Sequence, residues 1–184
     1  MALTLNGSTN AIGGLAVGGV PDGTIDTDAL AASAVTAAKR GTDSILQIKI
    51  HQLTGTISQI NSNTNTWVDT GLTKDITPAA TGNPILLIAH LLHGCDCYTN
   101  AGHLVQYGFN RGGSIISHHR QSAWTDVTRI PGTIMFYDSG HSSTSSLTYK
   151  LQFRRHSAYA GTANAFVHGG EQDNAMLMLI ELKG

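Results

Sequence analysis

Residues 45–51 read ILQIKIH, and from this stretch onward the hydropathy pattern becomes a strict alternation. Apolar and polar side chains take turns along it: Leu46, Ile48 and Ile50 against Gln47, Lys49 and His51. A period of two residues predicts a β-strand with one buried, apolar face. Similar stretches recur at intervals of roughly 8–14 residues, separated by turn-forming residues. We therefore expect residues 43–184 to form a mainly β domain, an antiparallel jelly-roll-like sandwich.

Two of the expected strands have distinct signatures. The stretch 85–92 is apolar except for His90, which predicts a central strand buried on both faces. The stretch 130–137 contains Pro131 and Gly132, which favours an edge strand. The other expected strands are 53–60, 64–69, 104–109, 114–117, 147–154 and 175–182, with a turn at 61–65.

The composition supports β-structure and excludes several function classes. Charged residues make up 12% of the 184 residues, about half the usual fraction of roughly 25%. Glutamate occurs only twice, whereas serine and threonine total 35 and glycine 21, so good helix formers are scarce. A net charge of −1 provides no basic field for nucleic acid. No apolar run approaches the ~20 residues of a membrane span, and we expect no signal peptide.

The first 24 residues are predicted to form an extended arm that attaches to a larger particle. Six glycines and isolated apolar residues cannot offset an ordering entropy of roughly 1–2 kcal/mol per residue. The apolar residues that would anchor this arm to a partner are Leu3, Leu5, Ile12, Leu15, Val17 and Val20.

Residues 25–42 are predicted to form a short, alanine-rich helix and a linker. Asp26 or Thr27 can cap its start, Lys39 and Arg40 suit its last turn, and Gly41 suits its end. Because about 15 residues are marginal as an isolated helix, we expect it to pack against copies of itself or against the next domain.

The sequence offers little for catalysis or metal binding. His93, Cys95 and Cys97 could donate to zinc, but a closed zinc site needs four ligands, so we expect no metal and no other cofactor. Two cysteines this close do not make a disulfide framework. No Gly-x-Ser-x-Gly elbow and no phosphate-binding loop occurs. We expect no enzyme activity, although a Ser-His-Asp triad is recognised only by geometry.

A segment expected to be a loop, residues 117–126, concentrates side chains that favour recognition. The candidate receptor-binding residues are His118, His119, Arg120 and Trp124. An alternative interpretation is that Trp124 only closes the edge of the core. The stretch 154–159 has a similar content of arginine, histidine and tyrosine.

Several stretches, taken in order, resemble small tail-fibre and virion structural proteins of tailed bacteriophages of the cyanophage and marine-phage type. In the N-terminal part these are residues 6–10, 18–24 and 28–39. In the body they are residues 67–72, 76–78, 83–86, 145–154 and 178–182. The resemblance implies a homotrimer in the virion, assembled in the host cytoplasm, whose arm holds the particle and whose knob faces the host. It does not cover residues 118–124, and so it implies no ligand-binding residues.

Three functions remain open at this point. In a tail fibre, three copies would bind repeated host-surface glycans with avidity. In a capsid decoration protein or head fibre, the arm would grip the shell instead. In a hydrolase of capsular sugar, clustered carboxylates would line a groove. The expected partners are copies of the chain and other phage structural proteins, with a host glycan for the fibre, and neither nucleic acid nor membrane insertion.

Overall fold

The computed structural model describes residues 4–6, 11–13, 36, 39–54, 60–62, 64–96, 103–123, 128–156, 164–168 and 174–184. The chain divides into two units, Met1–Lys39 and Arg40–Gly184. Within the described ranges, no helix is both long enough and apolar enough to cross a membrane.

The N-terminal unit contains one short antiparallel strand pair. Strand β1 (Thr4–Asn6) pairs with β2 (Ala11–Gly13), which brings Leu5 opposite Ile12. The other four predicted anchor residues lie outside the described residues, and so does most of the expected helix. Near its end, the Lys39 N–H donates to the Thr36 carbonyl at 3.0 Å. The particle-attachment arm therefore stays a prediction.

One sheet of the second unit is built around strand β6. Its strands are β3 (Ile45–Leu53), β4 (Ile60–Ser62), β6 (Ile85–Asp96), β10 (Thr128–Asp138), β12 (Asn164–Val167) and β13 (Ala175–Leu182). Strand β10 runs along one edge of β6. The other edge of β6 pairs first with β13 and then with β12, which are flanked in turn by β3 and β4. We call this the β6 sheet.

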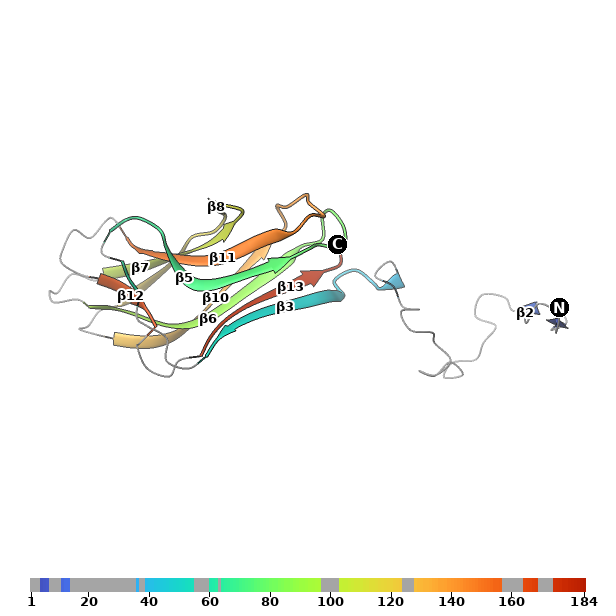
Figure 1. The fold of residues 1–184 in the computed structure, drawn as a ribbon, viewed down its shortest axis with the longest axis horizontal. Coiled ribbons are helices and arrows are strands. Elements are labelled where there is room, and N and C mark those ends of the chain that lie inside the picture. Colours follow the sequence, from blue (N-terminus) through green and yellow to red (C-terminus); the bar gives the residue numbers. More distant parts are fainter. Residues whose placement is uncertain are drawn as a thin grey trace. The chain divides into compact units, whose positions relative to one another are not determined.

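The second sheet covers the first. Its strands are β5 (Val68–Ile76), β7 (His103–Arg111), β8 (Ser114–Ile115), β9 (His119–Ala123) and β11 (Leu147–Arg155). Strand β11 lies between β5 and β7, and β8 and β9 share the other edge of β7. We call this the β7 sheet. All pairings are antiparallel, and Figure 1 shows the two sheets as stacked layers. The expected antiparallel sandwich is confirmed.

The core lies between the sheets and follows the strand alternation. On β6 and β13, alternate side chains are completely buried: Ile85, Leu87, Ala89 and Leu91, with Ala175, Leu177 and Leu179. They face the buried side chains of β7 and β11: Val105, Tyr107 and Phe109, with Tyr149, Leu151 and Phe153. Burial of these apolar surfaces, worth about 25 cal/mol per Å², is the main term that holds the two layers together.

Two buried carboxylates are fully hydrogen-bonded. Asp138 accepts from Arg111 Nη1 at 2.6 and 2.7 Å, from the Tyr149 hydroxyl at 2.7 Å and from the Gly140 N–H at 3.0 Å. Glu181 accepts from Asn83 Nδ2 at 2.6 Å, from the Ala79 N–H at 2.7 Å and from Gln47 Nε2 at 2.5 Å. Each carboxylate, near the end of its strand, thus binds a loop: Asp138 of β10 binds the loop at Gly140, and Glu181 of β13 binds the loop that contains Ala79 and Asn83.

Several sequence predictions agree with these elements. The last strand has the predicted bounds, and the 147–154 stretch forms β11 with Tyr149, Leu151 and Phe153 buried. Among the described strands, β10, which carries Pro131, pairs only with β6 and is therefore an edge strand.

Other predictions were wrong. The apolar side chains of β3 do not face the core, because Ile48 and Ile50 are 48% and 46% exposed. Strand β6 is central, but its side chains at 86, 88, 90 and 92 are only partly buried. The stretch 117–126 is not a loop throughout, since His119–Ala123 forms β9. Strand β4 occupies part of the expected 61–65 turn, and β5 begins only at Val68.

The fold leaves no free space for a side chain at Gly108. A Cβ there would lie 2.9 Å from Trp67 Cη2, 3.0 Å from Ile115 Cγ2 and 3.1 Å from the Ser117 carbonyl oxygen. We predict that Gly108→Ala lowers the free energy of unfolding by about 1–3 kcal/mol, because the backbone oxygen cannot yield without moving a strand connection. Urea denaturation measures this loss. In the control, Gly41→Ala, nothing lies within 4 Å of the new Cβ, so equal losses would contradict the prediction.

Candidate functional site

The structure separates the residues that the sequence placed together in one receptor-binding loop. His118 is exposed, and its ring lies 5.7 Å from that of Trp67. The next residue, His119, packs against Phe109 and Phe136, with ring centroids 6.1 and 6.5 Å away. Arg120 is exposed, and Trp124 lies outside the described residues. His118 and His119 therefore belong to two different surroundings.

A cavity of about 210 Å³ lies beside His119, between the edge strands β9 and β10. Its lining consists of Tyr107, His119, Arg120, Thr133, Ile134 and Met135. The Tyr107 hydroxyl and His119 Nε2 are buried, and neither has a hydrogen-bond partner among the described residues. A buried polar group without a partner costs about 1–3 kcal/mol, so water or a ligand in this cavity would be stabilised by these two atoms. We call it the β9–β10 cavity.

The electrostatics of the cavity suit a neutral imidazole beside a cation. Burial and the neighbouring His118 lower the pKa of His119, which keeps its ring neutral at pH 7. Burial raises the pKa of Tyr107, so its hydroxyl remains protonated. Arg120 carries a positive charge. Burial lowers the pKa of Arg154, and the charge of Arg120 lowers it further. The cavity thus offers a buried hydroxyl and a neutral imidazole to a hydroxyl-rich ligand, and the exposed Arg120 at its border is a neighbouring positive charge.

Trp67 forms a second feature on the outside of the β7 sheet. The Arg154 guanidinium lies 4.4 Å from the centroid of its ring, a cation–π contact. Arg154 is held there because its Nε donates to Gln106 at 2.9 Å and its Nη1 to the Asn65 carbonyl at 3.1 Å. Together with the close approach of Gly108, these contacts make Trp67 a cover for strand β7 rather than an open aromatic platform.

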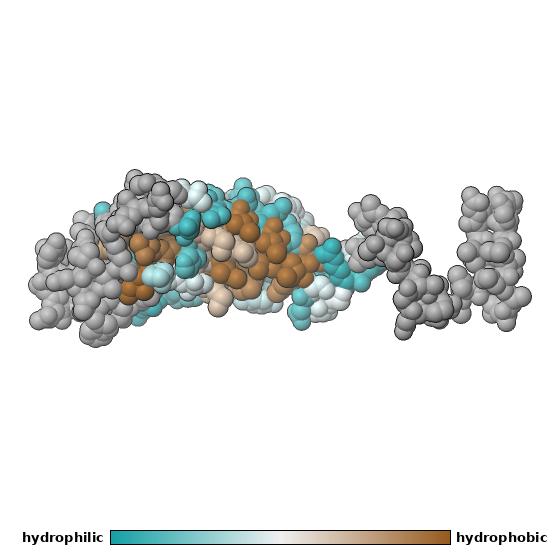
Figure 2. Space-filling view, turned by 90° about the horizontal axis from the view of Figure 1, so that it is seen from below, coloured by the Kyte–Doolittle hydropathy of each residue, from teal (hydrophilic) through white to brown (hydrophobic). Residues whose placement is uncertain are grey.

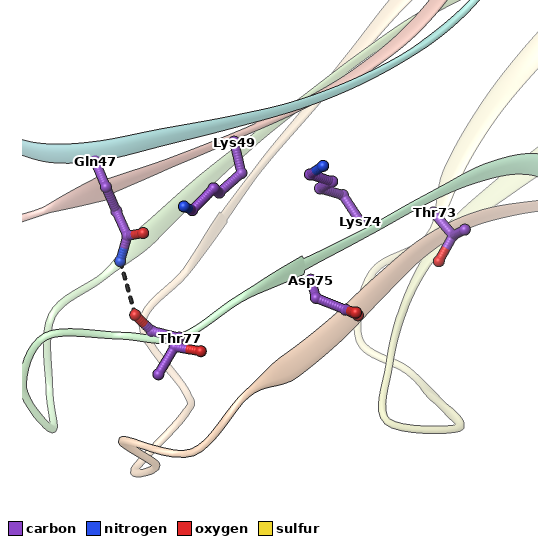
Figure 3. A pocket seen from close by; sticks show the side chains of 6 residues that line it. All are labelled: Gln47, Lys49, Thr73, Lys74, Asp75 and Thr77. Atoms are coloured by element: carbon purple, nitrogen blue, oxygen red, sulfur yellow. Dashed lines mark hydrogen bonds between the residues drawn. The ribbon is translucent and has the colours of Figure 1, made fainter.

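A larger and more open cleft lies between β3 and β5 (Figure 3). It measures about 470 Å³ and is lined by Gln47, Lys49, Thr73, Lys74, Asp75 and Thr77. Gln47 Nε2 donates to the Thr77 carbonyl across it at 2.7 Å. None of its described side chains has a buried polar atom without a partner. It is therefore a solvated polar surface. Because its polar atoms do not need a ligand as a hydrogen-bond partner, it is a weaker candidate for a binding site than the β9–β10 cavity.

Of the three residues considered for zinc, His93, Cys95 and Cys97, only His93 has a side chain that the structure describes. It is 2% exposed, its ring lies 5.5 Å from that of Tyr107, and burial lowers its pKa to about 4. Neither ring nitrogen has a hydrogen-bond partner in the described part of the chain. Cys95 lies on β6, whereas Cys97 falls outside the described residues. Within the described ranges, no three His, Cys, Asp or Glu side chains form a group that could hold a metal ion.

The sequence analysis missed four of the six lining residues, and two of these four, Tyr107 and Thr133, are polar. Tyr107 lies on β7 directly opposite His119, and Thr133 lies on the edge strand of the other sheet. No local pattern marks them, because the cavity forms only when β9 pairs with β7 and the two sheets stack.

Comparisons with known proteins do not identify a family. No protein-family model and no curated protein matches the chain. Among solved structures, it is similar to that of the Gx strain of infectious bursal disease virus, with 12% identity and a TM-score of 0.40 over 76% of this chain. It is also similar to the VP2 subviral particle of that virus, with 11% identity and a TM-score of 0.41 over 77% of this chain. The matches span only 38% and 43% of those viral chains.

Proposed function

We propose that the chain is a structural protein of a bacteriophage virion, a homotrimeric tail fibre that attaches to the host surface. The order of its motifs resembles small tail-fibre proteins of tailed phages, which supports this role. The division into a short N-terminal unit and a β-sandwich also fits an arm that holds the particle and a knob that meets the host.

The β9–β10 cavity is the observation that carries the attachment role. The Tyr107 hydroxyl and His119 Nε2, which have no hydrogen-bond partner among the described residues, are suited to hydrogen-bond sugar hydroxyls, and Arg120 is suited to pair with a carboxylate. A saccharide that contains uronic or other acidic sugars matches this set of groups. One such site binds weakly, and three copies on one fibre would raise the avidity.

We predict that Arg120→Ala and His119→Ala each weaken binding of the full-length protein to acidic polysaccharide from the host envelope about 5–30-fold. The reason is the loss of one charge-assisted or buried hydrogen bond, worth about 1–2 kcal/mol. Glycan-array or calorimetric titration measures the change. Lys74→Ala, in the open β3–β5 cleft, is the matched control. Unaltered binding by both cavity variants would show that the cavity holds only water.

A capsid decoration protein or head fibre is the second candidate. The N-terminal unit is compatible with this alternative, because an arm could grip shell subunits as well as a tail. A sugar hydrolase is a weaker candidate, since the two buried carboxylates of the described chain are fully engaged in structural hydrogen bonds. Sustained release of sugars from host polysaccharide would overturn the proposal of a non-enzymatic protein.

We predict that deletion of residues 1–24 leaves a folded sandwich that no longer enters virions. The sandwich has its own core, whereas the deleted segment would supply the grip on the particle. Immunoblotting of purified particles measures incorporation, and circular dichroism of the purified variant verifies its fold. Normal incorporation of the truncated chain would contradict the arm hypothesis. The copy number of the intact protein then distinguishes the candidates, since a tail holds few copies and a shell holds many.

A further inference from the structure

The outer face of the β6 sheet carries two uninterrupted apolar rows across four strands. In register, Met135 of β10, Ile88 of β6, Met178 of β13 and Ile50 of β3 form one row. Tyr137, Leu86, Ile180 and Ile48 form the next. Figure 2 views the sandwich from this side and shows hydrophobic side chains gathered across the middle of the face. We call these eight residues the apolar face.

The apolar face presents several large hydrophobic side chains to the solvent. Its outermost members, Ile48, Ile50, Met135 and Tyr137, are between 46% and 59% exposed. Four strands about 4.8 Å apart and two rows about 7 Å apart cover roughly 19 by 14 Å. Three of the four residues in the next row are polar, namely Thr133, His90 and Gln52, whereas the fourth is Met176. His90 Nδ1 and Thr133 Oγ1 are 3.0 Å apart, so the face has a mainly polar border on that side. An apolar centre with a polar rim is the usual anatomy of a protein interface.

We infer that the apolar face is the surface through which copies of this chain associate. None of its eight residues carries a charge, so it offers nothing to select a charged partner. A flat sheet face packs well on another sheet at about 10 Å, and homo-oligomer interfaces are the most apolar class. The net charge of −1 opposes association of copies only weakly. The face alone covers about a third of the ~800 Å² per partner of a standard interface, so bordering residues such as Ile45, which is 51% exposed, must add to it.

This inference deepens the proposed function and rests on it for the number of copies, which the face does not specify. It differs from the expected helix contacts at residues 25–42, because it places association on the sandwich itself. Solution mass tests the face, whereas incorporation into particles tests the virion role, so the two can fail separately.

The test compares full-length variants by light scattering after gel filtration, over a roughly hundredfold range of concentration. We expect the wild type to be an oligomer of the 19.4 kDa chain, and Ile50→Lys/Met135→Lys to be a monomer with an unchanged circular dichroism spectrum. Thr73→Lys/Thr148→Lys, which adds the same two charges to exposed positions of the β7 sheet, should keep the wild-type mass.

A monomeric wild type would overturn the inference, as would an oligomer in the first double variant or dissociation of the control. If the double variant fails to fold, Met135→Lys alone provides the test. Met135 lies on an edge strand and is 59% exposed, so a charge there disturbs the core least. This single variant should shift the monomer–oligomer midpoint at least tenfold toward the monomer, and an unshifted midpoint would contradict the inference.

Discussion

Replacing Asp138 with alanine is expected to lower the free energy of unfolding by about 3–5 kcal/mol, the usual effect of removing one partner of a buried ion pair. Asp138 is 3% exposed and accepts from Arg111, Tyr149 and the Gly140 N–H. Its loss leaves the buried Tyr149 hydroxyl without its acceptor and removes the countercharge of the Arg111 guanidinium, which still donates from Nη2 to the Gly140 carbonyl at 3.3 Å. Burial alone would raise the pKa of Asp138, but these hydrogen bonds lower it overall, which shows that they favour the ionised form.

The sandwich contains a suitable control for this prediction. Lys150 and Asp69 form an ion pair at 3.1 Å, but their side chains are 41% and 50% exposed. Exposed pairs contribute only about 0–1 kcal/mol, so Asp69→Ala should change stability little. Urea denaturation at one fixed protein concentration measures both variants. If both variants lost a similar free energy of unfolding, this would contradict the claim that the Asp138 network stabilises the fold more than the exposed pair because it is buried.

Between pH 6.5 and pH 4 the sandwich is expected to lose up to about 3 kcal/mol of stability because of His93. Burial lowers the pKa of His93 from 6.5 to about 4 in the folded state. Above pH 6.5 the ring is neutral in both states, so His93 adds no pH dependence. Below pH 6.5 the unfolded chain takes up a proton that the folded chain does not, which favours unfolding until about pH 4.

The variant His93→Leu should remove most of this acid sensitivity. Neither imidazole nitrogen has a partner in the described structure, so an apolar side chain of similar size should be tolerated at pH 7. His119, whose pKa is also lowered, contributes in the same direction and will leave a residual slope. Although burial opposes it, hydrogen bonds from Tyr149 and Arg111 lower the pKa of Asp138 from its usual value, so this carboxylate affects a lower pH range.

Thermal or urea unfolding between pH 7.5 and pH 4 measures the His93 effect, with His118→Gln as the exposed control. The control should keep nearly all of the wild-type slope, because it removes only the part of the lowered pKa of His119 that is due to His118. A wild-type stability that does not change over this range would contradict the prediction. So would a His93→Leu variant that remains as acid-sensitive as the wild type.

The strand alternation predicted the fold well, because burial of one side of a sheet imposes a period of two. It identified β11, β13 and the edge strand that contains Pro131. It failed on β3, where the alternation is present but the apolar side faces outward. A period of two shows that the two faces of a strand differ, but it does not show which face meets the core. Only the pairing of Ile50 with Met178, on the outer side of β13, decides this.

The candidate site was predictable only in part. The concentration of histidine and arginine at 118–120 identified the neighbourhood of the β9–β10 cavity. It could not show that β9 turns His119 inward while His118 stays outside, since that depends on where the strand starts. Tyr107 and Thr133 come from two other strands on different sheets, and no spacing in the sequence relates them.

The position of β13 has a consequence for biosynthesis. This strand fills the place between β3 and β6, and it joins Glu181 to Gln47 across 134 positions of the chain. While the ribosome is still making the residues before β13, β3 lacks its partner β13, and residues 85–90 of β6 are paired along one edge only, with β10. The incomplete sheet therefore has a gap that only residues 175–182 can fill. The nascent chain must therefore delay closure until residues 175–182 emerge, and folding should be slow and vulnerable to aggregation in that interval.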